Sequence, residues 1–408
     1  MIPLETIRAH ILDAVPDLPA VERPLGEAAG LATAVPVTAD ESVPPFANSA
    51  MDGYALRASD TEGASESSPA VLRVVGDLPA GRAPDMTVGP GEAVRIMTGA
   101  VVPDGADAVV MVEATESSGD EVRVGATAGV GDHIRSAGGD VAPGDRVLET
   151  GTTLGPAHIG VLASIGHSVV RVRRAARVGV LSTGDELEDA ASPGVLEPGR
   201  IRDANRPMLL ELLTRAGCDS VDLGIAGDDE ELIVATLSEA LESCDAVITS
   251  GGVSVGDYDY VKAALDRLGT LEWNQVAIKP AKPLAFGVVD GRPVFGLPGN
   301  PVSSLVSFEL FARPALLQMA GHTRRFRPEV DAVAASDMPR RSDGKIHFDR
   351  VTLTTIEGSP HAERVGSQAS NVLSATASAD GFAVLPDGEG VRSGDPVRVM
   401  LIHAAANH

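Results

Sequence analysis

The sequence predicts a multidomain protein with α/β and all-β parts, built around a central doubly wound α/β domain with a mostly parallel sheet. Its 408 residues exceed what one compact core supports, so the chain should divide into several domains. From about residue 177 to residue 321, short apolar strand-like runs alternate with helical segments. Such alternation is typical of a parallel sheet that is covered on both faces. Residues 46–144 instead carry many Gly, Pro and Asp residues between short valine-rich runs, which indicates an all-β module.

The regions on either side of the β module set the expected domain boundaries. Helical segments are expected over 3–34 and 155–166, so the module should interrupt a discontinuous domain. After the polar break at 321–330, short strands and turns predict a small carboxy-terminal β-barrel. The expected domains are a discontinuous amino-terminal helical and extended domain (1–45 and 145–174), the inserted β-rich domain (46–144), the α/β domain (175–323) and the barrel (328–408).

Within the α/β domain, each element follows from a local pattern. Strands are expected at RVGVLST, SVDLGIA, DAVITS, QVAIK and PLAFGVV, which are short and apolar. The stretch NRPMLLELLTRAG has an Asn suited to capping, an early Pro, helical apolar spacing and a terminating Gly. The stretches TGDEL, GIAGDD, TSGGVSVGD and LPGNP each follow a strand and precede a helix. They should therefore meet at the carboxyl edge of one sheet, where open α/β folds bind ligands.

Charge and composition exclude several classes of protein. The net charge of −24 and the pI near 4.7 argue against broad binding to nucleic acid or anionic membrane. No apolar run approaches the ~18–20 residues of a membrane span, and the amphipathic amino terminus does not resemble a signal peptide. A cytoplasmic protein is therefore expected. Two cysteines exclude a disulfide framework and a Cys-based zinc site. The acidity fits either a high-salt habitat or a GC-rich genome.

Lysine is scarce in this chain, and two of its four lysines, Lys279 and Lys282, lie in IKPAKPLAF. Each is followed by a proline, which fixes its own φ and biases the preceding residue toward extended geometry. In an extended segment, positions three apart point to roughly opposite sides, so the two ammonium groups converge only if the prolines bend the chain. A compact ammonium suits a small tetrahedral oxyanion. The stretch predicts an oxyanion site, with solvated strand-edge lysines as the alternative.

Carboxylates and hydroxyls gather at the same predicted sheet edge. The glycine-rich stretch TSGGVSVGDYDY contains Ser250, Ser254 and Asp259, and its glycines would let backbone N–H groups approach a phosphate. Glu186 in TGDEL and Asp228 in GIAGDD add carboxylates, which beside a phosphate suit Mg²⁺. Helix capping is the alternative for each acidic residue, but capping does not explain why they gather with two lysines.

Two further groups of motifs are less specific. In GLPGNPVSS, Pro298 and Pro301 flank Gly-Asn before Ser303, at the start of a helix. This is either a structural turn or a rigid wall with N–H groups aimed at an anion. The β module holds turn-like polar stretches in PPFANSAMDGYAL, RIMTGA and SAGGDVAPGD, which periodicity does not connect to the sheet edge. Their notable side chains are Asp52, Thr98 and Asp140.

Together these stretches resemble the molybdopterin molybdenumtransferases, which insert molybdate into the pterin dithiolene, and the carboxy-terminal region of gephyrin. The resemblance runs through PPFANSAMDGYAL, RIMTGAVVPDGADAVVMVE, GVLSTGDEL, ITSGGVSVGDYDYVK, KPAKPLAFG and FGLPGNPVSS. Six ordered motifs are more specific than any one of them. The chain departs from the family pattern at Ala47, where Asp is common, at Ala281, where Gly is usual, and at Gln275, which is often basic.

The resemblance implies a homodimer of four-domain subunits, with a cleft between the α/β domain of one subunit and the amino-terminal modules of the other. It implies adenylylated molybdopterin and molybdate as substrates, Mg²⁺ as cofactor, release of AMP, and a molybdopterin adenylyltransferase as a candidate partner. The implied catalytic residues are Asp52, Thr98, Glu186, Asp228, Asp259, Lys279 and Lys282, and the implied metal ligands are Glu186, Asp228 and Asp259. The implied substrate-binding residues are Asp140, Ser250, Gly251, Gly252, Ser254, Pro298, Asn300, Pro301, Ser303, Arg350 and Ser370.

Two other functions stay open on the sequence alone. A molybdopterin adenylyltransferase would share the GGVS-type loop and use the same crevice with ATP, although that activity needs only the central domain. A non-catalytic molybdopterin carrier or scaffold would be similar to gephyrin's related region at synapses. Retention of the carboxylates and both lysines favours catalysis.

Overall fold

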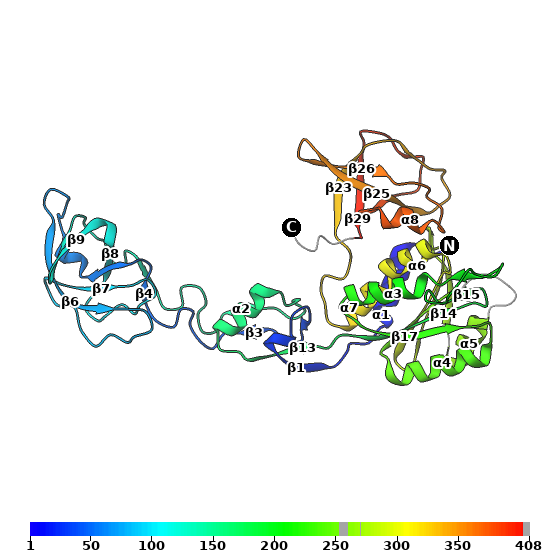
Figure 1. Cartoon of the computed structure of the whole chain (residues 1–408), viewed down its shortest axis with the longest axis horizontal. Helices are drawn as coiled ribbons and strands as arrows, with labels where there is room; N and C mark the ends of the chain where they lie inside the picture. The colour runs from blue at the N-terminus through cyan, green and yellow to red at the C-terminus, as the bar shows by residue number, and fades with distance from the viewer. Residues whose placement is uncertain (253–259, 270, 403–408) are drawn as a thin grey trace.

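The computed structural model describes residues 1–252, 260–269 and 271–402. Figure 1 shows an elongated chain in which the β module lies at the far end of an arm. A small domain around α2 (Pro156–Ser164) forms the middle of the arm, and the α/β domain with the barrel above it forms the broad end (Figure 1). The multidomain α/β and β fold predicted from the sequence is confirmed. Within the described ranges, no helix combines the length and apolarity that crossing a membrane requires.

The α/β domain is a six-stranded sheet covered on both faces. Its strands lie in the order β17 (Asp219–Ala226), β14 (Arg177–Thr183), β18 (Ala246–Ser250), β22 (Arg292–Leu297), β21 (Pro283–Val289) and β19 (Leu271–Gln275). The first four are parallel, and β21 and β19 are antiparallel. One face packs on α4 (Glu230–Ser243) and α5 (Tyr260–Leu268). The other packs on α3 (Asn205–Arg215), α6 (Pro301–Ser307) and α7 (Arg313–Met319). Two covered faces explain why the strands are apolar runs rather than alternating ones.

The first helix, α1 (Leu4–Ala14), packs on the α/β domain and not on the arm. Its buried face of Leu4, Ile7 and Ile11 joins the core beneath α7. The chain start is also tied to the lysine loop, because Ile2 N–H donates to Gln275 O (2.8 Å). The sequence placed this segment in the discontinuous amino-terminal domain, so the structure differs from that expectation.

Residues 20–33 contain two strands joined by a short 3-10 turn, Leu25–Glu27, which corrects the helix expected there. β1 (Ala20–Pro24) and β2 (Ala32–Thr33) pair on either side of β13 (Val169–Arg173) in an antiparallel sheet. Prolines interrupt any helix in this region. The partner strand follows the inserted module, so the pairing joins chain segments from both sides of the insertion.

The inserted module is a six-stranded sheet. Its strands lie in the order β8 (Ala108–Met111), β5 (Gly53–Leu56), β7 (Glu92–Ile96), β6 (Ala70–Leu78), β10 (Glu121–Val124) and β9 (Thr115–Ser118). Short two-stranded ribbons connect the module to the rest of the arm. They pair β4 (Asn48–Ser49) with β11 (Ile134–Arg135) and β3 (Val37–Thr38) with β12 (Arg146–Leu148).

The carboxy-terminal domain is a small closed barrel. The order β25 (Ile346–Ile356), β26 (Ser359–Arg364), β23 (Glu329–Ala334), β29 (Pro396–Leu401) and β27 (Gly381–Leu385) closes by pairing of β27 with β25. A strand of the α/β domain, β20 (Ile278–Lys279), adds to this sheet by parallel pairing with β25. QVAIK is therefore not one strand: its first residue ends β19, and its last two extend the barrel sheet. The lysine stretch thus connects two domains.

Candidate active site

A cavity of about 520 Å³ lies at the carboxyl edge of the α/β sheet, and we call it the sheet-edge pocket. All four loops that the sequence assigned to this edge contribute to it. The lining includes Gly184 and Glu186 after β14, Asp228 after β17, Ser250, Gly251 and Gly252 after β18, and Pro298, Gly299 and Asn300 after β22. The parallel topology therefore brings these separate motifs together.

Specific contacts hold these loops in place. Asn205, at the start of α3, donates through Nδ2 to Ser250 Oγ (2.8 Å) and to Gly299 O (2.7 Å). The sequence suggested Asn205 as a helix cap, but its side chain joins two pocket loops instead. Gly251 has a φ of 106°, and an added Cβ would lie 2.5 Å from Thr183 O. Only glycine fits this close approach.

Glu186 and Asp228 present exposed carboxylates to the sheet-edge pocket. Within the described part of the chain, neither carboxylate takes part in a hydrogen bond or an ion pair, and carboxylate oxygens are the ligands that Mg²⁺ prefers. The neighbouring Asp185 is occupied, because its Oδ1 accepts from Asp228 N–H (3.0 Å). The other expected ligand, Asp259, and Ser254 lie outside the described residues. Among the residues that are described, no three acidic, His or Cys side chains cluster as a metal site.

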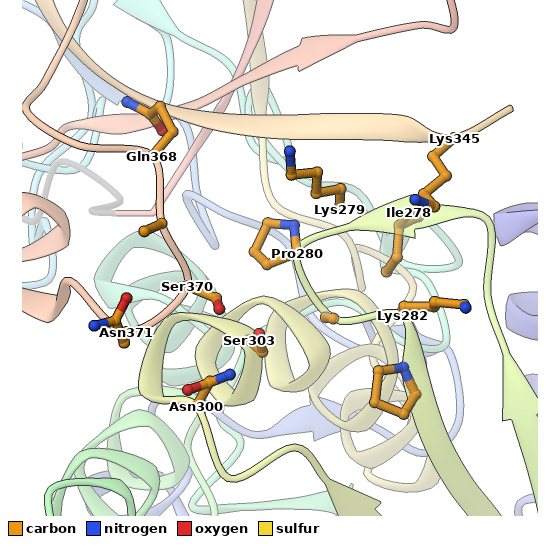
Figure 2. Close-up of a pocket in the computed structure, with 13 residues that line it drawn as sticks. Ile278, Lys279, Pro280, Lys282, Asn300, Ser303, Lys345, Gln368, Ser370 and Asn371 are labelled. Atoms are coloured by element: carbon orange, nitrogen blue, oxygen red, sulfur yellow. The ribbon is translucent and has the colours of Figure 1, made fainter. Parts of the chain in front are cut away.

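A second cavity of about 650 Å³, the lysine pocket, lies between the lysine loop, the start of α6 and a loop of the barrel. Figure 2 shows its lining side chains, which include Lys279, Lys282, Lys345, Asn300, Ser303, Gln368, Ser370 and Asn371. Three of the chain's four lysines thus line one cavity, and no acidic residue among those that the structure describes does so. In a chain with a net charge of −24, this cavity is a local concentration of positive charge, which suits an anion.

The lysine loop is bent as the prolines suggested, but the side chains do not point to one spot. The Lys279–Pro280 peptide bond is cis, and Ala281 has a φ of 74°. In Figure 2, Lys279 extends toward Gln368, whereas Lys282 leaves the loop in another direction. Neither ammonium forms an ion pair with a residue that the structure describes. They share a cavity and can bind one ligand from different sides.

The two pockets are neighbours. Pro283 and Asn300 line both of them. The carboxylates of the sheet-edge pocket and the ammonium groups of the lysine pocket therefore open onto adjoining spaces. A ligand with several anionic groups can span this boundary.

Comparison with known proteins gives the same order of parts. Residues 2–166 match the MoeA N-terminal region (domain I and II), 179–318 a probable molybdopterin binding domain, and 331–402 the MoeA C-terminal region (domain IV). Molybdopterin molybdenumtransferase 2 of Mycobacterium tuberculosis is 44% identical over 373 residues, which are 89% of this chain and 90% of that protein. The chain belongs to the molybdopterin molybdenumtransferase family of enzymes.

Other members of the family agree along nearly the whole length. The Haemophilus influenzae molybdopterin molybdenumtransferase is 37% identical over 404 residues, 98% of each chain. The crystal structure of the molybdopterin biosynthesis moeA protein from Pyrococcus horikoshii superposes with a TM-score of 0.85 at 30% identity. It covers 98% of this chain and 100% of its own.

In the α/β domain and the barrel, two described residues that the family resemblance placed in the site line neither pocket. Arg350 is 1% exposed, and its guanidinium donates to Ser367 O (2.6 Å) and Ala369 O (3.0 Å). It therefore supports the loop that carries Ser370, and does not face the cavity. Pro301 is the first residue of α6.

The arm carries the other expected site residues, and it extends away from the domains that hold both pockets (Figure 1). Asp52 Oδ1 accepts from Thr98 N–H and from Thr98 Oγ1, each at 2.7 Å. These hydrogen bonds lower the pKa of Asp52. Asp140 is exposed on the connection between the module and the middle of the arm. Figure 1 shows the module at the opposite end of the molecule from the barrel.

The sequence reading missed Lys345, Gln368 and Asn371 of the lysine pocket. A signal for Lys345 was present, because the lysine scarcity that singled out the other two applies to it as well. Gln368 and Asn371 lie beside Ser370 in the tail stretch GSQASN, and only the folded loop shows that they face the cavity.

Proposed function

We propose that this chain inserts molybdenum into molybdopterin, using adenylylated molybdopterin and molybdate, with Mg²⁺, and that it releases AMP. One observation carries the proposal: a pocket lined by carboxylates and glycines adjoins a pocket lined by three lysines, and both share Pro283 and Asn300. The substrates require this pairing, because one carries a pyrophosphate link and the other is a tetrahedral dianion.

The lysine pocket would bind molybdate. Lys279 and Lys282 supply ammonium groups from the loop, and Ser303 and Ser370 lie at the opposite wall. Ammonium groups in such a cavity stabilise a dianion and the negative charge that develops on a leaving phosphate. Hydroxyls can donate to the remaining oxygens. The protein's contribution is positioning and charge, not a covalent intermediate.

The sheet-edge pocket would bind the pyrophosphate link and the nucleotide of the adenylylated substrate. Gly251 and Gly252 allow the backbone to approach phosphate oxygens closely. Glu186 and Asp228 would hold Mg²⁺, which when bound polarises the pyrophosphate link. When each adjoining pocket holds one substrate, molybdate lies near the pterin end of the adenylylated molybdopterin.

We further propose a homodimer in which the arm of one subunit completes the site of the other. Asp52 and Thr98 are exposed and hydrogen-bonded to each other. The inserted module that carries them lies at the opposite end of the chain from the α/β domain and the barrel (Figure 1). A two-fold partner would place this pair at the cleft, as closed dimers commonly do with long extensions. An adenylyltransferase partner in the cytoplasm would supply the adenylylated substrate.

Reconstitution with purified components tests the function. Wild-type protein with adenylylated molybdopterin, molybdate and Mg²⁺ should form molybdenum cofactor and AMP. Lys282→Gln and Glu186→Gln should each lower the rate by at least about tenfold, whereas Arg392→Gln, an exposed arginine of the barrel, should not. Unchanged AMP release in both variants would contradict catalysis and favour a scaffold. Adenylylated product from ATP and molybdopterin would favour an adenylyltransferase.

A further inference from the structure

Lys345 is placed against the lysine loop by strand pairing. Ile346 N–H donates to Ala277 O (2.9 Å), and the register pairs Ile278 with Ile346 and Lys279 with His347. Side chains of paired residues in a sheet share a face, and successive residues alternate between faces. Lys345 therefore lies on the same face as His347 and Lys279, and it lines the lysine pocket together with Ile278 and Lys279.

The Lys345 ammonium is held by Asp343. Its Nζ lies 2.9 Å from Asp343 Oδ2, and its side chain is 21% exposed. Figure 2 shows this side chain reaching from the barrel strand toward the Ile278–Lys279 segment. An ammonium has three N–H donors, and Asp343 takes one of them. The others remain for a ligand in the cavity that Lys345 lines.

Three neighbouring side chains hold Asp343 in place. Its Oδ1 accepts from Arg340 (2.9 Å) and lies 3.2 Å from His347 Nε2, and its own N–H donates to Asp387 (3.0 Å). Asp343 does not line the lysine pocket but an adjacent cavity of about 330 Å³. The Asp343 carboxylate thus holds the Lys345 ammonium but does not itself line the lysine pocket.

This anchoring distinguishes Lys345 from the two lysines of the loop. Lys279 and Lys282 are exposed and form no ion pair with a described residue, so each must lose side-chain freedom when it binds a ligand. A lysine that is already held in place loses less, and that saving appears as affinity.

We infer that Lys345 supplies a third ammonium group to a tetrahedral dianion in the lysine pocket, and that Asp343 is its positioning residue. The inference rests on the proposed function, in which that dianion is molybdate. It adds a charged residue from the barrel to a site whose other two ammonium groups come from the α/β domain. The barrel then contributes charge to the site as well as its Ser370 loop.

Titration calorimetry with inorganic molybdate and the full-length protein tests Lys345. We expect Lys345→Gln to raise the molybdate Kd about tenfold, the usual effect of losing one charge-assisted hydrogen bond. Lys345→Arg should fall between Lys345→Gln and wild type, because a planar guanidinium fits the tetrahedral anion less well. Arg392→Gln removes the same charge from an exposed position of the same domain and should bind as wild type does. Matching melting temperatures would show that the variants are folded.

The outcomes separate this inference from the proposed function. If the wild-type protein binds no molybdate, both fail. If Lys282→Gln weakens binding but Lys345→Gln binds like wild type, only the role of Lys345 is overturned.

Asp343→Asn tests the positioning role, because two explanations predict opposite signs. If Asp343 acts only as a nearby negative charge, its neutralisation should tighten molybdate binding. If it positions Lys345, binding should weaken, by about threefold, with a higher KM for molybdate and an unchanged kcat. Tighter binding, or a loss confined to kcat, would overturn the positioning role.

Discussion

Arg350 holds in place the barrel loop that forms one side of the lysine pocket. Besides the carbonyls of Ser367 and Ala369, it contacts Gln368 Oε1 (3.3 Å). In turn, Gln368 donates a hydrogen bond through Nε2 to Arg350 O (3.2 Å). The loop carrying Ser370 is then joined to α6, because Val302 N–H donates to Ser370 O (3.1 Å). One buried guanidinium therefore fixes the barrel side of the cavity.

We expect Arg350→Ala to destabilise the barrel by about 2–4 kcal/mol, because it removes the hydrogen bonds to the carbonyls of Ser367 and Ala369 and empties a buried side-chain position. Arg350→Lys should recover only part of this, since an ammonium cannot reach the same carbonyls as the planar fork. Calorimetric unfolding measures the loss, and limited proteolysis should show new cleavage between residues 366 and 372. Arg398→Ala is the control, because Arg398 is exposed and its pair with Glu329 is long (3.5 Å). Equal losses in the Arg350 and Arg398 variants would contradict this role.

His322 should make stability depend on pH. Burial, with nearby Arg313, lowers the pKa of His322, and its Nδ1 lies 2.8 Å from Thr153 Oγ1. Below its ordinary pKa of about 6.5, the unfolded chain binds a proton that the folded chain does not, so stability falls as pH falls.

His322→Asn keeps an acceptor for Thr153 but cannot titrate. The variant should therefore be less stable than wild type, or equal to it, at pH 7.5, and should gain on it at pH 5.5. Urea unfolding at the two pH values measures this difference. A constant difference between the proteins would show that His322 does not titrate in this range.

At the level of elements, the arm meets the α/β domain at Gly151. Its φ is 79°, and an added Cβ would lie 2.5 Å from Thr323 Cγ2 and 2.9 Å from Gly321 O. Thr323 also donates to Gly151 O, through Oγ1 (3.2 Å). The turn that follows helix α7, with Gly321 and Thr323, thus packs directly onto the arm.

Gly151→Ala should destabilise this junction by about 2–4 kcal/mol, from left-handed backbone strain plus steric overlap. Gly194→Ala is a matched control: Gly194 has a φ of 85°, and an added Cβ there would meet nothing within 4 Å. The control should lose only about 1 kcal/mol of strain energy. Differential scanning calorimetry of both variants measures the two losses, and similar values would contradict the close packing at Gly151.

The elements that the sequence predicted well are those decided by nearby residues. β21 coincides with the predicted run at 283–289, because an apolar strand buried on both faces ends at a D-G turn. The gathering of four loops was also predictable, since parallel topology alone sends them to one edge. The strand at 20–24 was missed because its partner β13 lies beyond the inserted module. The strand expected at QVAIK was not divided into the end of β19 and β20, because the partner of β20 belongs to another domain.

The candidate site was predictable to the same extent. Lysine scarcity pointed to Lys279 and Lys282, and both line the lysine pocket. Arg350 was expected in the site but lies buried beneath the pocket loop. Its motif position could not show whether the guanidinium turns inward or outward. Asn205 was read as a helix cap because its two loop partners are distant in sequence.

At the level of the whole molecule, the length of the arm is the decisive feature. The inserted module, which carries Asp52 just before β5, and the α/β domain, which carries Lys282 just before β21, lie at opposite ends of one chain (Figure 1). If both act in one site, that site must be shared between two chains. The arrangement makes a prediction that single-variant assays cannot address.

Co-expression of Asp52→Ala chains with Lys282→Gln chains should restore activity that neither variant has alone. In a mixed dimer, one site receives both defects and the other receives none. Equal co-expression makes half the dimers mixed, so about a quarter of wild-type activity is expected. Differently tagged chains and tandem purification would isolate the mixed dimers for assay of molybdenum cofactor formation. No recovery in those dimers would mean that each site is built from a single chain.

The addition of β20 to the barrel sheet has a consequence for dissecting the protein. A fragment ending near residue 320 would keep the whole six-stranded sheet of the α/β domain, yet Ile278 and Lys279 would lose the strand beside them. Such a fragment should fold and still fail to retain the oxyanion. The barrel is therefore not a separable appendage, and swapping it between relatives would exchange part of the site along with it.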